Sequence, residues 1–136
     1  MIPETTYSPE VLQNAQVTIR PSLDWKIDFE KNRIIGNVDE TEAVRQAVYM
    51  ILSTERYTQP IHTWGHGVET HDLYQSNRFY IIPQLQSRIM AALYQDDRIR
   101  DVSNFSFDVK GGVYGVTFDV KTVFDDTINI STEVAL

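Results

Sequence analysis

Residues 39–56 read DETEAVRQAVYMILSTER, and this stretch carries the clearest fold signal in the sequence. It begins with Asp39, a good helix N-cap, and Glu42 three residues later completes a capping-box pattern. Apolar residues then recur at the period of a helix with one buried face. They are Val44, Ala47, Val48, Ile51 and Leu52. We therefore predict an amphipathic helix that ends near Thr54 to Arg56.

The segment before this helix has the period of a strand. Trp25, Ile27 and Phe29 alternate with polar residues, which predicts a strand with one buried face. A turn follows, and residues 33–38 are expected to return as a second strand. Residues 1–23 contain three prolines and little periodicity, so we predict an extended N-terminal arm there.

The middle of the chain changes character. Residues 57–77 hold Pro60, two glycines, three histidines and Trp64, which predicts an ordered loop rather than a helix. Pro83 suits the first turn of a helix, and a second apolar stripe at helical period follows it. That stripe consists of Leu85, Ile89, Ala92 and Leu93. We therefore predict a second helix here.

The end of the chain is typical of strands. Alternating runs over residues 105–109 and 116–120 flank Gly111-Gly112, which is a strong hairpin signal. A last alternating run, over residues 128–134, predicts a further strand. We therefore expect one α+β domain over residues 24–136. Its two main helices would pack on a mostly antiparallel sheet, in the order strand, strand, helix, loop, helix and three strands.

Composition excludes several classes of function. The 136 residues include no cysteine, which rules out disulfides, thiolate catalysis and cysteine zinc sites. A net charge of -7 without a basic patch argues against nucleic acid or an anionic membrane as a partner. No apolar run approaches the ~20 residues that span a bilayer. The first residues lack the features of a secretory signal, so we expect synthesis in a cytoplasm.

The three histidines form a weak candidate metal site. His62 and His66 stand four residues apart, and His71 follows. Such a pair can share a metal on a helix, but Gly65 and Gly67 argue against a helix here, and no HExxH pattern is present. We interpret all three as loop histidines and predict no metal and no cofactor.

Paired carboxylates are the second candidate for chemistry. Glu55, Glu69 and Asp72 flank Trp64, as they might in a glycosidase. That reaction needs two carboxyls about 5 to 9 Å apart, one with a raised pKa. With 19 acidic residues, a chance trio is expected, and we predict no catalytic residue. We interpret the charged run Asp96-Asp97, beside Arg98, as a solvated helix end.

The pair Glu55-Arg56 stands where the first helix meets the loop. An exposed pair of this kind contributes less than about 1 kcal/mol. The planar guanidinium of Arg56, however, can bind several loop carbonyls or a carboxylate at once. We therefore predict that the pair is a structural clamp for the loop or a contact offered to a partner.

Six stretches of the chain, taken together, have a distinctive order and spacing: Ala43–Ala47, Ile51–Tyr57, Gly67–Glu69, Ala91–Ile99, Val102–Phe105 and Phe118–Thr122. In this they resemble the baseplate wedge and sheath-initiator family of contractile phage tails. The likeness covers roughly residues 24–125 and is strongest to the branch of Gram-positive prophages and phage-tail-like bacteriocins. A small wedge protein of T-even phages, once suspected of being a lysozyme, and a baseplate subunit of type VI secretion systems belong to the same family.

The resemblance implies a structural protein without enzymatic activity in the virion tail baseplate, assembled in the bacterial host cytoplasm. It implies a ring of about six copies that binds the tail sheath protein and other wedge proteins, with the tail tube or hub as a further partner. The family's helix-end Glu-Arg falls on Glu55 and Arg56. Thr54 stands where many distant members have glycine, and the glycine that follows the motif falls on Gly65 or Gly67.

A sheath initiator of this kind must offer an unpaired strand to the sheath by strand addition. The alternating residues Ile128, Ile130 and Thr132 mark the candidate contact strand, and the arm before residue 23 is the alternative. A tail-associated peptidoglycan hydrolase that uses Glu69 or Asp72 remains the alternative function. A small binding module without any tail connection is a third.

Overall fold

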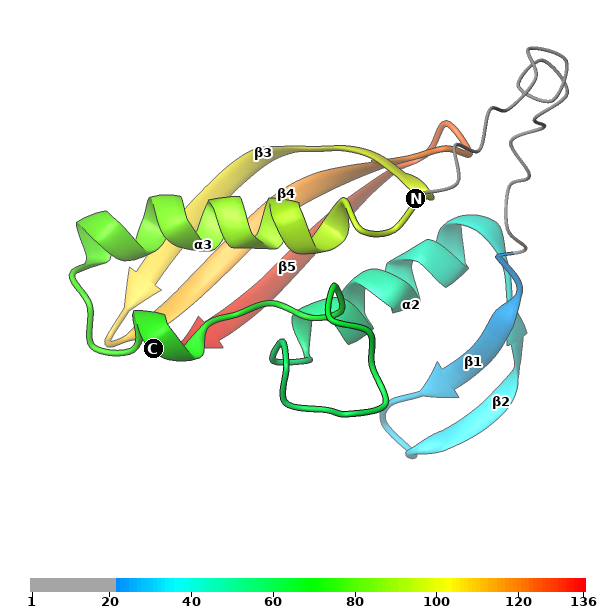
Figure 1. Ribbon diagram of the computed structural model, residues 1–136. Helices are drawn as coiled ribbons and strands as arrows, with labels where there is room; N and C mark the ends of the chain where they lie inside the picture. Colours follow the sequence, from blue (N-terminus) through cyan, green and yellow to red (C-terminus); the bar gives the residue numbers. More distant parts are fainter. Residues whose placement is uncertain (1–21) are drawn as a thin grey trace, which may run out of the picture.

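The computed structural model describes residues 22–136, which form a β-hairpin, two helices and a three-stranded antiparallel sheet (Figure 1). The order of strands and helices confirms the predicted α+β fold. Apart from Ser22 and Leu23, the arm predicted for residues 1–23 lies outside the described residues. No helix within residues 22–136 is long and apolar enough to cross a membrane.

The main sheet is a meander of β3 (Ile99–Lys110), β4 (Val113–Thr122) and β5 (Thr127–Ala135), with β4 at the centre. Gly111 and Gly112 make the tight turn between β3 and β4 with φ angles of 54° and 86°, which glycine adopts at little cost. The predicted hairpin and the predicted last strand are therefore confirmed.

Two helices cover one face of this sheet: α2 (Glu40–Leu52) and α3 (Arg78–Leu93). In Figure 1, α3 crosses over the sheet, and α2 lies next to β5, the strand of this sheet that it contacts. Both predicted helical stripes point into the core, where they meet alternate residues of β4. The side chains at the centre of this core include Val44, Val48, Leu85, Ile89, Leu93, Val116, Phe118 and Val120.

The first helix begins as predicted and ends slightly earlier than predicted. Asp39 is its N-cap, and its carboxylate accepts a hydrogen bond from the Glu40 N–H at 2.7 Å. The helix ends at Leu52, and Ser53 is its C-cap. The hydroxyls of Ser53 and Thr54 each donate to a carbonyl four residues earlier, at 2.7 Å, and so satisfy groups that a helix end leaves free.

The predicted start of the second helix was wrong. Asn77 is the N-cap, and its side chain accepts a hydrogen bond from the Phe79 N–H at 2.9 Å. The helix therefore begins at Arg78, and Pro83 lies inside it, in the second turn. A proline there cannot donate to the carbonyl of Phe79. Pro83 is exposed, so water can reach the carbonyl that it leaves free.

The N-terminal strands form a separate hairpin rather than part of the main sheet. β1 (Asp24–Asp28) pairs only with β2 (Arg33–Val38) within the described residues. The side-chain amide of Gln46 on α2 takes the place of a neighbouring strand. It accepts a hydrogen bond from the Ile27 N–H at 3.0 Å and donates to the Trp25 carbonyl at 2.7 Å.

This arrangement contradicts the buried face predicted for the first strand. Trp25 is 63% exposed, Phe29 is 46% exposed, and Ile34 on β2 is 61% exposed. Within residues 22–136, α2 is the main element that packs against the hairpin, and one helix is too narrow to cover the whole face. The alternation thus predicted the strand correctly but not its burial.

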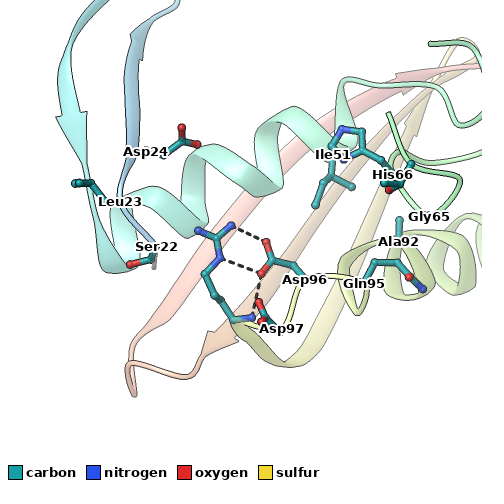
Figure 2. Close-up of a pocket in the computed structure, with 12 residues that line it drawn as sticks. Ser22, Leu23, Asp24, Ile51, Gly65, His66, Ala92, Gln95, Asp96 and Asp97 are labelled. Atoms are coloured by element: carbon teal, nitrogen blue, oxygen red, sulfur yellow. Dashed lines mark hydrogen bonds and ion pairs between the residues drawn. The ribbon is translucent and has the colours of Figure 1, made fainter. Parts of the chain in front are cut away.

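The charged run after α3 is only in part the solvated face predicted for it, because Asp97 is exposed but Asp96 and Arg98 are not. The side chains of Arg98 and Asp96 are 17% and 10% exposed and form a two-pronged ion pair, with Nη2–Oδ2 at 2.7 Å and Nε–Oδ1 at 3.0 Å. Asp96 also accepts the backbone N–H of Arg98 at 3.0 Å. Both residues line a cavity of about 440 Å³, together with Gly65 and His66. Figure 2 shows the carboxylate of Asp96 with its hydrogen bonds as dashed lines. The pair fixes the corner through which the chain enters β3.

Candidate functional site: a clamped loop beside an open strand edge

The loop after α2 is closed at its base by a short parallel bridge between Glu55 and Val68. The Arg56 N–H donates to the Val68 carbonyl at 3.1 Å, and the Val68 N–H donates to the Thr54 carbonyl at 3.0 Å. The chain on either side of the loop is thereby joined by backbone hydrogen bonds. The loop predicted for residues 57–77 is thus ordered, as expected, although no periodic pattern predicted this bridge.

Arg56 holds the second half of the loop. Its Nε donates to the Gly67 carbonyl at 3.3 Å, and its Nη2 donates to the Gly65 carbonyl at 3.4 Å. Its guanidinium carbon lies 5.9 Å from the centre of the Tyr57 ring, which in turn meets the Trp64 ring edge-on at 6.1 Å. One side chain therefore joins backbone and aromatic groups across the loop.

Glu55 binds the segment that follows the loop. One carboxylate oxygen accepts the backbone N–H groups of Thr70 and His71, at 2.7 and 3.0 Å, and the other accepts the Thr70 hydroxyl at 2.6 Å. Burial alone would raise the pKa of Glu55. The hydrogen bonds from Thr70 and His71 outweigh it and hold the pKa below its ordinary value. We call Glu55 and Arg56, with these loop contacts, the clamp.

The clamp should make stability depend on pH in the acid range. Because the folded state has the lower pKa, ionised Glu55 contributes stability above its unfolded pKa of about 4.5. That contribution is lost as the pH falls through the folded pKa. We expect the free energy of unfolding, measured by urea denaturation, to fall between about pH 5 and pH 3, and to fall less in Glu55→Gln. Equal acid losses in both proteins would contradict this role.

Gly67 and Gly65 have different roles, which the sequence alone could not distinguish. Gly67 has a φ of +93°, and a Cβ there would lie 2.6 Å from the Thr54 carbonyl oxygen. At Gly65, a Cβ would meet only the end of the Gln95 side chain, at 2.9 Å. Gly67 is therefore the position that requires glycine, because the bridge brings another backbone too close for any side chain.

The other predicted contact, β5, is an edge strand with a regular ladder. The Leu136 N–H donates to the Gly112 carbonyl and the Thr122 N–H to the Asp126 carbonyl, both at 2.9 Å, at the two ends of the β4–β5 pairing. Hydrogen-bonded pairs alternate along an antiparallel ladder. The alternation therefore assigns Ile128, Ile130 and Thr132 to the bonded pairs, and Ile128 is 1% exposed on the core side.

The residues between them turn their backbone groups away from β4. These groups belong to Thr127, Asn129, Ser131, Glu133 and Ala135. Within residues 22–136 no strand pairs with this side of β5. Sequence reasoning found the strand but singled out its core-facing residues, because apolar alternation reports side-chain burial rather than hydrogen-bond direction.

The opposite edge, on β3, is less regular. Its pairing with β4 shifts register twice, between Ile99 and Asp101 and between Ser103 and Ser106. The N–H of Val102 is already occupied, because it donates to the Tyr94 hydroxyl at 3.2 Å. Bulges and side-chain caps of this kind discourage pairing with another chain, whereas β5 has neither.

Of the two carboxylates proposed for a hydrolase, that of Asp72 takes part in a structural contact. Asp72 pairs with Arg88, whose Nη2 lies 2.8 Å from Oδ2, and this hydrogen bond holds the pKa of Asp72 below its ordinary value. Arg88 also donates to the Glu69 carbonyl at 3.0 Å. A glycosidase acid needs a raised pKa. Asp72 is therefore held in the ionised form, which favours a structural role for this cluster.

The histidines separate into two groups. His62 and His66 stack with ring centres 4.1 Å apart, and burial together with His62 lowers the pKa of His66. His71 lies near the clamp, with Nδ1 3.9 Å from a Glu55 oxygen. In the part of the chain that the structure describes, no group of three or more His, Cys, Asp or Glu side chains is placed to hold a metal ion.

An open, regular strand edge can accept an extended segment of a partner protein as an added strand. The chain belongs to the contractile injection system sheath initiator family, whose model matches residues 23–125. It is similar to the phage-like element PBSX protein XkdS of Bacillus subtilis (strain 168), with 33% identity over 126 residues that cover 90% of this chain and 88% of that protein. Membership confirms the resemblance to the Gram-positive prophage branch and makes the chain a sheath-initiating component of a contractile tail.

Proposed function

We propose that the chain starts the tail sheath by accepting an extended segment of the sheath protein at the open edge of β5. The observation that carries this proposal is the nine-residue register of β5, which runs without a bulge beside an edge that no strand pairs with in residues 22–136. Backbone groups of the incoming segment would pair with the outward groups of β5. The first sheath ring would thereby take its strand geometry from the baseplate.

The clamped loop supplies a second contact in this proposal, to other baseplate wedge proteins. Tyr57, Ile61 and Trp64 are 64%, 89% and 84% exposed, although Arg56 fixes the loop that carries them. Large exposed side chains on an ordered loop can bind a partner without losing much conformational entropy. About six copies would form a ring in contact with the sheath, the wedge proteins and the tail tube or hub, and assembly would take place in the bacterial host cytoplasm.

A proline on the open edge of β5 tests strand addition. Ser131 is exposed and its N–H points away from β4, so Ser131→Pro removes one outward donor while the β4–β5 ladder stays intact. We expect the number of sheathed particles, counted by electron microscopy after complementation of a deletion strain, to fall about tenfold or more.

Ser131→Ala is the matched control, because it removes the same hydroxyl but keeps the N–H. The only side-chain contact of that hydroxyl in residues 22–136 is with the Thr117 hydroxyl, at 3.4 Å. Particles with Ser131→Ala should therefore carry normal sheaths. Normal sheaths on particles that contain folded Ser131→Pro protein would contradict strand addition at β5.

A further inference from the structure

A cavity of about 240 Å³ lies between the end of α2, helix α3 and the last part of β5. Its apolar lining includes Val68, Leu85 and Ile89, which are 4%, 0% and 1% exposed. On the sheet side it is lined by residues 132–135 of β5. The cavity is thus a hollow at the margin of the sheet, where α2 lies next to β5 (Figure 1), and its lining combines these apolar residues with polar ones such as Ser53 and Thr70.

The lining on β5 shows how the cavity relates to the open edge. Thr132 and Val134 face the helices, whereas Glu133 and Ala135 direct their backbone groups away from β4. Because residues of both kinds line the cavity, it lies next to the unpaired edge of β5, on the face of the sheet that the helices cover. It is therefore where side chains of a strand paired with β5 would arrive.

Pairing geometry determines which side chains those would be. Residues directly opposite each other on neighbouring strands point to the same face of a sheet. A residue opposite Thr132 or Val134 would point toward the helices and into the cavity, and the residues on either side of it would point to the outer face. Building on the proposed function, we propose that the cavity is a specificity pocket for one apolar side chain of the sheath segment that pairs with β5.

The apolar part of the lining favours an apolar occupant over a charged one, and the remaining lining is polar, with Ser53, Thr70 and Glu133 among its residues. Leu85 and Ile89 offer no hydrogen-bonding group to a side chain on the floor, so a buried charge there would lose its hydration. The carboxylate of Glu55, on the wall, already accepts three hydrogen bonds from Thr70 and His71. The clamp therefore shapes the wall of the pocket, which links the two predicted parts of the site.

A peptide experiment tests the pocket with the full chain. Overlapping peptides that cover the sheath protein of the same particle are labelled, and their binding is measured by fluorescence anisotropy. The peptide whose binding Ser131→Pro abolishes is then scanned with alanine. We expect one apolar position to lose about tenfold or more in affinity, while its immediate neighbours change little.

A filled cavity provides the complementary variant. Thr132→Phe places a ring in the hollow and should weaken the original peptide about tenfold. The peptide with alanine at the sensitive position should regain affinity for this variant. Thr117→Phe is the matched control, because Thr117 lies on the outer face of β4, away from the pocket. Melting temperatures of both variants check that they are folded.

The outcomes separate the two proposals. A peptide that requires the Ser131 N–H but shows no sensitive apolar position would overturn the pocket and leave strand addition standing. If no peptide binds, or if Ser131→Pro has no effect on binding, both proposals fail. The alanine scan uses the unaltered protein, so it decides the question even if Thr132→Phe does not fold.

Discussion

The Gly67→Ala variant is expected to lose about 3 kcal/mol of its free energy of unfolding. Gly67 has a φ of +93°, which side-chain-bearing residues rarely adopt, and its new Cβ would lie 2.6 Å from the Thr54 carbonyl oxygen. That oxygen accepts the Val68 N–H, so relief of the clash must open the bridge at the base of the loop. The melting temperature, measured by calorimetry, should fall by about 10 °C.

Gly65→Ala is the matched control, two residues away on the same loop. Its Cβ would meet only the end of the Gln95 side chain, which can rotate away. We expect it to change the free energy of unfolding by less than about 1 kcal/mol. Similar losses in the two variants would show that the backbone approach at Gly67 is not what the loop depends on.

The fold was predictable wherever side-chain periodicity and local capping agree. The stripe from Val44 to Leu52 and the paired runs around Gly111-Gly112 each specify an element and its buried face. The start of α3 was missed because Pro83 is a good first-turn residue, whereas Asn77, the true N-cap, looked like part of the loop. The exposure of Trp25 was missed because alternation cannot show whether anything covers a strand.

The sequence singled out residues for the candidate site but did not predict their hydrogen-bond partners. Chain position alone placed Glu55 and Arg56 at a helix–loop junction, where a clamp is plausible. Their actual partners stand 9 to 16 residues later in the chain, as for Gly65 and His71, and no local pattern records such contacts. Similarly, the alternation around Ile130 revealed an edge strand, but the outward backbone groups follow from the ladder rather than from residue type.

The corner between α3 and β3 gives the second large effect. Asp96→Ala removes three hydrogen bonds to Arg98 and leaves a guanidinium that is only 17% exposed without its carboxylate. Removal of one partner from a buried pair is far more damaging than its net attraction suggests, because the remaining charge stays desolvated. We expect the free energy of unfolding, measured by urea denaturation, to fall by about 3–5 kcal/mol.

Two comparisons identify the cause of that loss. Asp97→Ala removes the neighbouring carboxylate, which is exposed, and should cost less than about 0.5 kcal/mol. The double variant Asp96→Ala/Arg98→Met removes both charges and keeps an apolar side chain in place of the guanidinium stem. It should be more stable than Asp96→Ala, because no unpaired charge remains at the corner. If the double variant were less stable than the single one, the packing of Arg98, rather than its orphaned charge, would explain why the corner needs Asp96.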